Sequence, residues 1–238
     1  MKTILITNDD GIDADGLFRL AKEAQHFGRV YITAPDGQRS AASHSITLHG
    51  QIDVYPYAYP LEGVTAWTCS GTPADCVRAG SLYLMPQKPD AVLSGINRGY
   101  NTATDIQYSG TVGAALEAAF QGFRGIAFSE QDSGCHEVTD HSLHALLAEL
   151  LETELPPDQV LNVNIPGCRL AECRGILRDR TVSRSMFYND RYRKITDLPE
   201  HGIRLEVDGL YSENAEEGTD MRAVIDRYIS VGYVSRIR

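Results

Sequence analysis

Short apolar runs alternate with helical patterns through the first two-thirds of the chain, and this order is the strongest constraint on its fold. The runs that predict strands are residues 4–6, 29–34, 64–69, 91–93, 125–129 and 160–165. The helical patterns include a leucine-rich face at residues 143–151, which stops before Pro156-Pro157. Strands that alternate with helices form a largely parallel sheet with helices on both faces, so we predict an α/β fold.

A polar cluster follows each of four predicted strands. The first is Asn8-Asp9-Asp10-Gly11, and the others span residues 35–47, 70–73 and 94–97. In a parallel sheet these strand ends lie along one edge, where ligands bind. The adjacent carboxylates of Asp9 and Asp10 repel each other and are costly to desolvate unless a positive charge lies between them. Hard divalent cations such as Mg²⁺ and Mn²⁺ prefer oxygen ligands, so we predict one such ion here.

Ser40 and Asn97 lie in two of the other clusters and offer neutral oxygen ligands to the same ion. Together with Asp9 and Asp10 they would form a site of almost no net charge, which still accepts a phosphate dianion and leaves positions for water. A simple turn at the aspartates, and ordinary loop hydrogen bonds at Ser40 and Asn97, are the alternative interpretations. The convergence of the strand ends favours the metal site.

The segment from Tyr108 to Ala115 opens a helix with glycine, hydroxyl side chains and other small residues. The first turn of a helix has free N–H groups, so Ser109, Gly110 and Thr111 predict a binding site for an anion. In the plainer interpretation, Ser109 only caps the helix, and this is compatible with anion binding.

Composition and absent motifs exclude several classes of function. A formal net charge of −10 argues against a broad basic face for a polynucleotide. No Gly-x-Gly-x-x-Gly follows a predicted strand, so we expect no dinucleotide cofactor. We also expect no signal peptide and no membrane contact, because no apolar run approaches the roughly 18 residues of a membrane span. Five cysteines without a Cys-x-x-Cys are typical of reduced thiols in a cytoplasmic protein.

The character of the chain changes near residue 178. Residues 178–200 are rich in arginine and tyrosine and poor in aliphatic side chains. We predict a catalytic core over residues 1–177, followed by an arm and oligomerisation segment over residues 178–238 that completes the fold. Such a segment cannot form a core of its own, so we expect it to pack on another copy of the chain.

In combination, these motifs resemble those of the SurE (survival protein E) family of metal-dependent nucleotidases. The matching pieces run nearly end to end in the family's order, and they are Ile4 to Gly11, Ala34-Pro35-Asp36, Arg39-Ser40, Ser43 to Thr47, Gly71 to Val77, Ser94 to Asn101, Asp105, Tyr108 to Ala115, Leu161 to Pro166, Gly218-Thr219-Asp220 and Gly232 to Ser235. The resemblance implies a Rossmann-like fold and hydrolysis of nucleoside 5′- and 3′-monophosphates, and in some relatives of short polyphosphate.

The resemblance also implies roles for single residues. The implied ligands of one divalent metal ion are Asp9, Asp10, Ser40 and Asn97, and the catalytic residues among them are Asp9, Asp10 and Asn97. The residues implied to bind phosphate are Asn101, Ser109, Gly110 and Thr111. The implied assembly is a homodimer or homotetramer that exchanges C-terminal segments.

The chain departs from the family pattern in its second loop and in its arm. Gly37, Gln38 and Ala41 stand where the pattern has Arg, Asn and Gly, and residues 182–199 lack the expected Pro-Arg-Gly and Tyr-Tyr-Trp pieces. These differences bear on substrate preference and on the exchange of arms. Two other functions suit the same motifs: a phosphate- or nucleotide-binding regulator without hydrolysis, and a phosphotransferase that forms an aspartyl-phosphate on Asp9 or Asp10. The preferred nucleotide and the native metal are open at this point.

Overall fold

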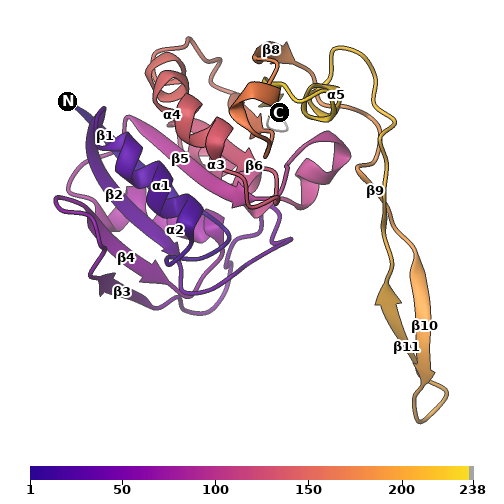
Figure 1. Cartoon of the computed structure of the whole chain (residues 1–238). Helices are drawn as coiled ribbons and strands as arrows, with labels where there is room; N and C mark the ends of the chain where they lie inside the picture. The colour runs from indigo at the N-terminus through magenta and orange to yellow at the C-terminus, as the bar shows by residue number, and fades with distance from the viewer. Residues whose placement is uncertain (236–238) are drawn as a thin grey trace.

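A central nine-stranded sheet organises the chain, for which a computed structural model describes residues 1–235 (Figure 1). Its strands are β1 Lys2–Thr7, β2 Gly28–Pro35, β3 Val54–Tyr57, β4 Thr65–Cys69, β5 Ala91–Arg98, β6 Arg124–Glu130, β7 Gln159–Ile165, β8 Ile176–Arg180 and β13 Ile229–Ser235. Their order across the sheet is β3-β4-β2-β1-β5-β6-β7-β13-β8. Every neighbouring pair is parallel except β3 with β4 and β7 with β13. The predicted α/β fold with a largely parallel sheet is therefore confirmed.

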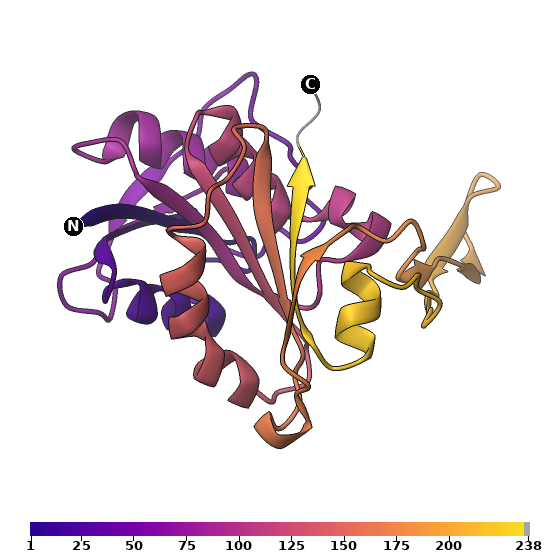
Figure 2. The same cartoon turned by 90° about the horizontal axis from the view of Figure 1, so that it is seen from above.

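Helices cover both faces of the sheet (Figure 2). They are α1 Asp15–Ala24, α2 Pro73–Ala79, α3 Gly110–Phe120, α4 Glu137–Leu150 and α5 Asp220–Ile225, with shorter helical turns at Gly80–Leu84, Ala103–Tyr108 and Leu170–Glu172. Helices α1 and α4 pack on one face, and α2 and α3 pack on the other. Within residues 1–235, the helices are too short or too polar to cross a membrane.

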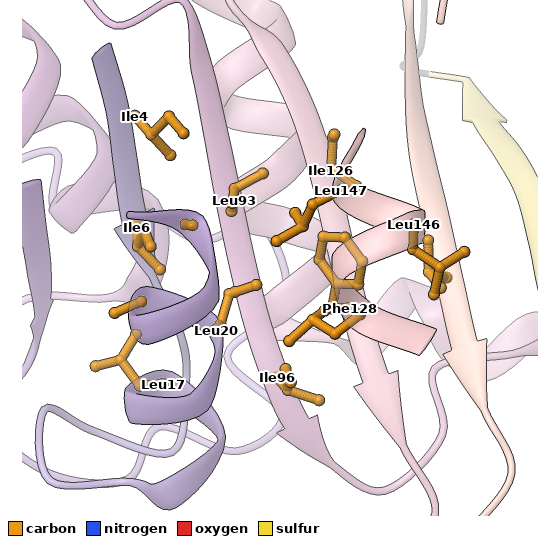
Figure 3. Packing of buried hydrophobic residues seen from close by; sticks show 14 of the residues in the cluster. Ile4, Ile6, Leu17, Leu20, Leu93, Ile96, Ile126, Phe128, Leu146 and Leu147 are labelled. Atoms are coloured by element: carbon orange, nitrogen blue, oxygen red, sulfur yellow. The ribbon is translucent and has the colours of Figure 1, made fainter. Parts of the chain in front are cut away.

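The two layers of core follow from the alternation of side chains along β1. Ile4 and Ile6 face the layer that contains α1, whereas Leu5 faces the layer that contains α2 and α3. In the first layer, Phe128 of β6 packs among residues from α4 that include Leu146 (Figure 3). Fully burying each of these large side chains contributes about 1.5–3 kcal/mol. The strands are thereby fixed, and so are the loops that leave their carboxyl ends.

Three strands of the sheet, β3, β8 and β13, are absent from the sequence-based prediction. The edge strand β3 contains Pro56, a residue that weakens a strand prediction because it cannot donate to the ladder. Strand β13 returns from the C-terminal part of the chain and lies between β7 and β8. Part of the predicted extension 178–238 thus belongs to the central sheet, and its last residues, 236–238, lie outside the described residues.

A hairpin extends from the body of the molecule (Figure 1). Its strands are β10 Tyr192–Asp197 and β11 Ile203–Val207, and a second small pair at its base joins β9 Tyr188–Asn189 to β12 Leu210–Tyr211. Every residue of β10 and β11 is exposed. The hairpin therefore has no hydrophobic core of its own.

Candidate metal and phosphate site

The loop after β1 is held in one shape by its own polar groups. The side chain of Asn8 accepts a hydrogen bond from the Gly11 N–H at 3.2 Å and donates one to the Gly11 carbonyl at 2.8 Å. Gly11 has φ 102°, which favours glycine, and a Cβ there would lie 3.2 Å from the backbone of Gly37. The chain therefore forms a tight turn after β1, and this turn places Asp9 and Asp10 at the edge of the sheet.

The carboxylate of Asp9 is buried against the first turn of α3. The Thr111 hydroxyl donates a hydrogen bond to Asp9 Oδ1 at 2.5 Å, and a Cβ on Gly110 would lie 3.0 Å from the Asp9 Cβ. Burial raises the pKa of Asp9 to about 6; the hydrogen bond from Thr111 opposes this shift, and the charge of Asp10 adds to it. Within residues 1–235, no basic side chain pairs with this carboxylate. A cation would supply the missing positive charge.

Asp10 lies on the other side of the turn. Its Oδ2 accepts a hydrogen bond from the backbone N–H of Arg98 at 3.0 Å. Burial raises the pKa of Asp10, although the Arg98 hydrogen bond and positive charge lower it. The residue lines a cavity of about 780 Å³ that α1 also borders. One carboxylate therefore contacts α3, and its neighbour opens on a cavity at the opposite face of the sheet.

Ser40 lies in the loop that follows β2, next to the aspartates. The N–H of the preceding residue, Arg39, donates a hydrogen bond to the Asp9 carbonyl at 2.7 Å, which holds this loop against the β1 turn. The Ser40 side chain is exposed, and its Oγ accepts a hydrogen bond from Gln38 at 2.9 Å. The hydroxyl is therefore accessible from solvent.

Asn97 lies near the end of β5, just after the pairing register of β5 with β6 shifts. Such irregularities re-aim side chains at the ends of strands. The Asn97 amide donates a hydrogen bond through Nδ2 to the Gly99 carbonyl at 2.8 Å, and this bond does not use its Oδ1. Since β2, β1 and β5 are consecutive in the sheet, the four predicted metal ligands come from three adjoining strand ends.

The donor set suits a hard cation. Among residues 1–235, no group of three or more His, Cys, Asp or Glu side chains could hold a metal. The predicted set instead combines two carboxylates with the neutral oxygens of Ser40 and Asn97. Mg²⁺ and Mn²⁺ accept such oxygens and retain water in their remaining positions, whereas zinc prefers thiolate and imidazole.

The predicted phosphate residues mostly bond within the protein. Ser109 caps α3 by accepting a hydrogen bond from the Val112 N–H at 3.0 Å, and Thr111 supports Asp9. Asn101 is buried, and its amide donates a hydrogen bond to Ser129 Oγ at 2.7 Å. Gly110, the first residue of α3, has no partner for its N–H inside the helix. The structure brings Gly110 and Thr111 to the Asp9 carboxylate, and the role of Ser109, Gly110 and Thr111 toward phosphate stays a prediction.

Glu117 supports this edge and is missing from the sequence-based prediction. Its carboxylate lies 2.8 Å from Nε2 of His44, in the loop that carries Ser40, and 3.1 Å from Nη1 of Arg78, at the end of α2. Gln121 adds a hydrogen bond at 2.7 Å. The signal in the sequence was a single charged residue within a predicted helix, 110–120, whose other residues are apolar or small.

Known proteins resemble this chain over most of its length. The model of the family described as survival protein SurE matches residues 4–187. A protein of Synechococcus sp. (strain JA-3-3Ab) named 5'-nucleotidase SurE is 39% identical over 235 residues, covering 96% of this chain and 89% of its own. One of the same name from Clostridium botulinum (strain Loch Maree / Type A3) is 38% identical, covering 96% and 90%.

A solved structure also resembles this chain over nearly its whole length. The crystal structure of the SurE protein from Aquifex aeolicus superposes with a TM-score of 0.82 at 34% identity, covering 98% of this chain and 93% of that one. The family that the sequence motifs predicted is confirmed, and the chain belongs to the SurE family.

Proposed function

We propose that this chain is a 5′-nucleotidase that hydrolyses nucleoside monophosphates to nucleoside and phosphate with the help of one divalent cation, Mg²⁺ or Mn²⁺. The observation that carries the proposal is the Asp9 carboxylate, which is buried, lies at the N-terminus of α3 and has Asp10 beside it. Relatives named 5'-nucleotidase, similar over nearly the whole chain, support the choice of substrate.

The residues that would hold the cation are Asp9, Asp10, Ser40 and Asn97. A bound cation neutralises charge on the phosphate and lowers the pKa of a bound water, which makes that water a nucleophile near neutral pH. Thr111 orients Asp9 through its hydroxyl, and the Arg98 N–H orients Asp10. The N–H groups that open α3 favour the negative charge that grows on the phosphate in the transition state.

The finer parts of the proposal follow the family resemblance. We include 3′-monophosphates and short polyphosphate among the substrates, place the enzyme in the cytoplasm, and expect a homodimer or homotetramer. Asp9, Asp10 and Asn97 are the catalytic residues of this proposal. The residues assigned to phosphate binding in this proposal are Asn101, Ser109, Gly110 and Thr111. Of these, Asn101 and Ser109 act by holding neighbouring residues in position.

The test is release of phosphate by the full chain from a panel of nucleoside monophosphates and polyphosphates. Each reaction is run with Mg²⁺, with Mn²⁺ and with a chelator. The proposal expects hydrolysis that requires the metal. Phosphate binding without turnover would indicate a regulator, and a hydroxylamine-sensitive phosphoenzyme would indicate an aspartyl-phosphate phosphotransferase; either result contradicts the proposal.

A further inference from the structure

The short helical turn η2, Ala103–Tyr108, borders two parts of the candidate site. It follows β5 and ends directly before α3, so it sets where the first turn of that helix begins. It is also bonded to the loop that carries Ser40. In that loop, the Ser43 hydroxyl donates a hydrogen bond to the Gln107 carbonyl at 2.6 Å, and the Ser43 N–H donates one to the Tyr108 carbonyl at 3.0 Å. A shift of η2 would therefore move both the loop and the start of α3.

Ala103, the first residue of η2, has an unfavourable backbone conformation. Its φ is 57°, in the left-handed region that residues with a Cβ rarely adopt. Its side chain is fully buried and belongs to an apolar cluster with Phe187 and Met221. A conformation of this kind persists only where its surroundings hold it. The groups that hold Ala103 therefore determine the position of η2.

Asp220, the first residue of α5, holds this turn from a distant part of the chain. Its Oδ2 accepts a hydrogen bond from the Ala103 N–H at 3.1 Å. Its Oδ1 accepts two more, from the Ser183 N–H at 2.9 Å and from the Met221 N–H at 2.7 Å. The residue is only 3% exposed. Since all three donors belong to the backbone, the carboxylate fixes the course of the main chain at this point.

Resting on the nucleotidase activity proposed above, we propose that Asp220 is a positioning residue for this reaction. It holds the turn at Ala103, and through η2 it keeps the Ser40 loop and the start of α3 in place around the cation. Among the hydrogen bonds described for residues 1–235, those of the Asp220 carboxylate reach no predicted metal ligand. Its effect on the metal site is therefore indirect.

The variant Asp220→Asn removes one bond of the carboxylate. If its oxygen stays on the Ser183 and Met221 N–H groups, the amide turns an NH₂ group toward the Ala103 N–H, and two donors cannot bond each other. The strained turn should then relax. Adding Ala103→Gly should counteract this change, because glycine adopts a positive φ without support.

The chain offers a matched control at the other end of α5. Asp226 is also a carboxylate, but its Oδ2 accepts a hydrogen bond from Arg222 Nε at 2.7 Å instead of from η2. The variant Asp226→Asn therefore removes a charge beside the same helix and leaves the bond to η2 in place.

Two quantities are measured on the full chain. One is the Mn²⁺ concentration that gives half-maximal hydrolysis of adenosine 5′-monophosphate, and the other is the calorimetric Kd for Mn²⁺, which needs no turnover. Asp220→Asn should raise both about tenfold, the loss of one hydrogen bond. Asp226→Asn should leave both unchanged. The double variant with Ala103→Gly should recover part of the loss.

A variant that is merely less stable gives a different result. A smaller folded fraction lowers kcat and the number of binding sites in the titration, but it leaves the half-activating concentration and the Kd unchanged. That result would overturn the inference, and so would a double variant that binds Mn²⁺ no better than Asp220→Asn.

Two further outcomes are covered. If Asp220→Asn does not fold, Ser43→Ala breaks the link at its other end by removing the bond to Gln107. This variant should raise both quantities several-fold, and unchanged values would refute the inference. If the unmodified chain binds Mn²⁺ but hydrolyses no nucleotide, the proposed function fails, while a tenfold weaker Kd of Asp220→Asn would still support the positioning role and an equal Kd would refute it.

Discussion

Asp9 and Asp10 are adjacent in the sequence and yet have different surroundings. Asp9 receives the Thr111 hydroxyl and lies at the start of α3, whereas Asp10 receives a backbone N–H from Arg98 and lines the cavity. Burial raises the pKa of both carboxyl groups. In the proposed function a bound cation offsets this cost, so each carboxylate is needed for binding the ion as well as for catalysis.

Replacing Asp9 by Asn should lower kcat/KM for a nucleoside monophosphate by about 10²-fold or more, because one of two charged metal ligands is lost. Added Mn²⁺ should raise the Tm of the unmodified chain and leave that of Asp9→Asn unchanged, since a ligand stabilises only the state that binds it. Thermal melts and phosphate release measure both effects. Asp53→Asn, which changes an exposed carboxylate, is the control. Full activity of Asp9→Asn at saturating metal would contradict the metal site.

At the scale of elements, α3 is the support for the loop that carries Ser40. The N–H of Ser43 donates a hydrogen bond to the Tyr108 carbonyl at 3.0 Å, just before the helix. A Cβ on Gly113 of α3 would lie 2.4 Å from the Ser43 carbonyl oxygen. The loop and the helix therefore touch backbone to backbone, and any side chain at Gly113 must displace the loop.

Gly113→Ala should weaken activation by Mn²⁺ about tenfold, because displacing the loop moves Ser40 away from the aspartates. The helix itself should remain, since alanine favours a helix more than glycine does. Metal titrations of activity and circular dichroism measure the two effects. Gly37→Ala is the matched control in the same loop, because its Cβ would come no closer than 3.8 Å to its nearest neighbour, Arg39. Equal metal affinity for both variants would refute the prediction.

The Glu117 network predicts a dependence of stability on pH. Burial raises the pKa of Glu117, but hydrogen bonds from His44, Gln121 and Arg78 outweigh burial and leave the pKa below its usual 4.5. A lowered pKa in the folded state gives stability that is present above pH 4.5 and is lost as the pH falls through the folded value. Glu117→Gln should therefore reduce the free energy of unfolding by about 1–3 kcal/mol at pH 7.

Urea denaturation at a series of pH values measures this effect. The difference between the Glu117→Gln variant and the unmodified chain should shrink below pH 4.5, where the glutamate becomes protonated. A difference that stays constant from pH 7 to pH 3 would show that the charge of Glu117 contributes nothing to stability.

At the scale of the whole molecule, the hairpin of β10 and β11 extends away from the body, and every residue of its two strands is exposed (Figure 1). It exposes apolar side chains, among them Ile195, Ile203, Leu205 and Val207. A two-stranded hairpin is marginally stable alone, and exposed apolar patches mark interaction surfaces. The expected oligomer would cover this surface.

Deleting residues 192–207 should give a smaller species in light scattering, because the deletion removes the proposed contact between copies. The chain can be rejoined where the Asp208 N–H donates a hydrogen bond to the Arg191 carbonyl at 2.8 Å. Binding of Mn²⁺ should be retained, since no predicted metal ligand lies in the hairpin. A full-length chain that is monomeric at micromolar concentration would contradict the prediction.

The sequence by itself determined the α/β class, most helices and strands of the first 165 residues, with β3 as an exception, and the family. Alternation of strands and helices, the Asn8-Asp9-Asp10-Gly11 turn and the Ser109 cap are properties of neighbouring residues, so local patterns reveal them. The prediction that Asp9, Asp10, Ser40 and Asn97 converge rests on one topological rule, that parallel strands end at one edge.

Only the tertiary structure decided which distant groups meet. Strand β13 joins β7 across more than sixty residues of chain, Thr111 bonds Asp9, and Glu117 holds the loop around His44. His136 and Glu130, at the end of β6, line one cavity with Asp10 although Asp10 lies more than a hundred residues away in the chain. Such contacts depend on how strands and helices pack in three dimensions, and no pattern of neighbouring residues encodes them.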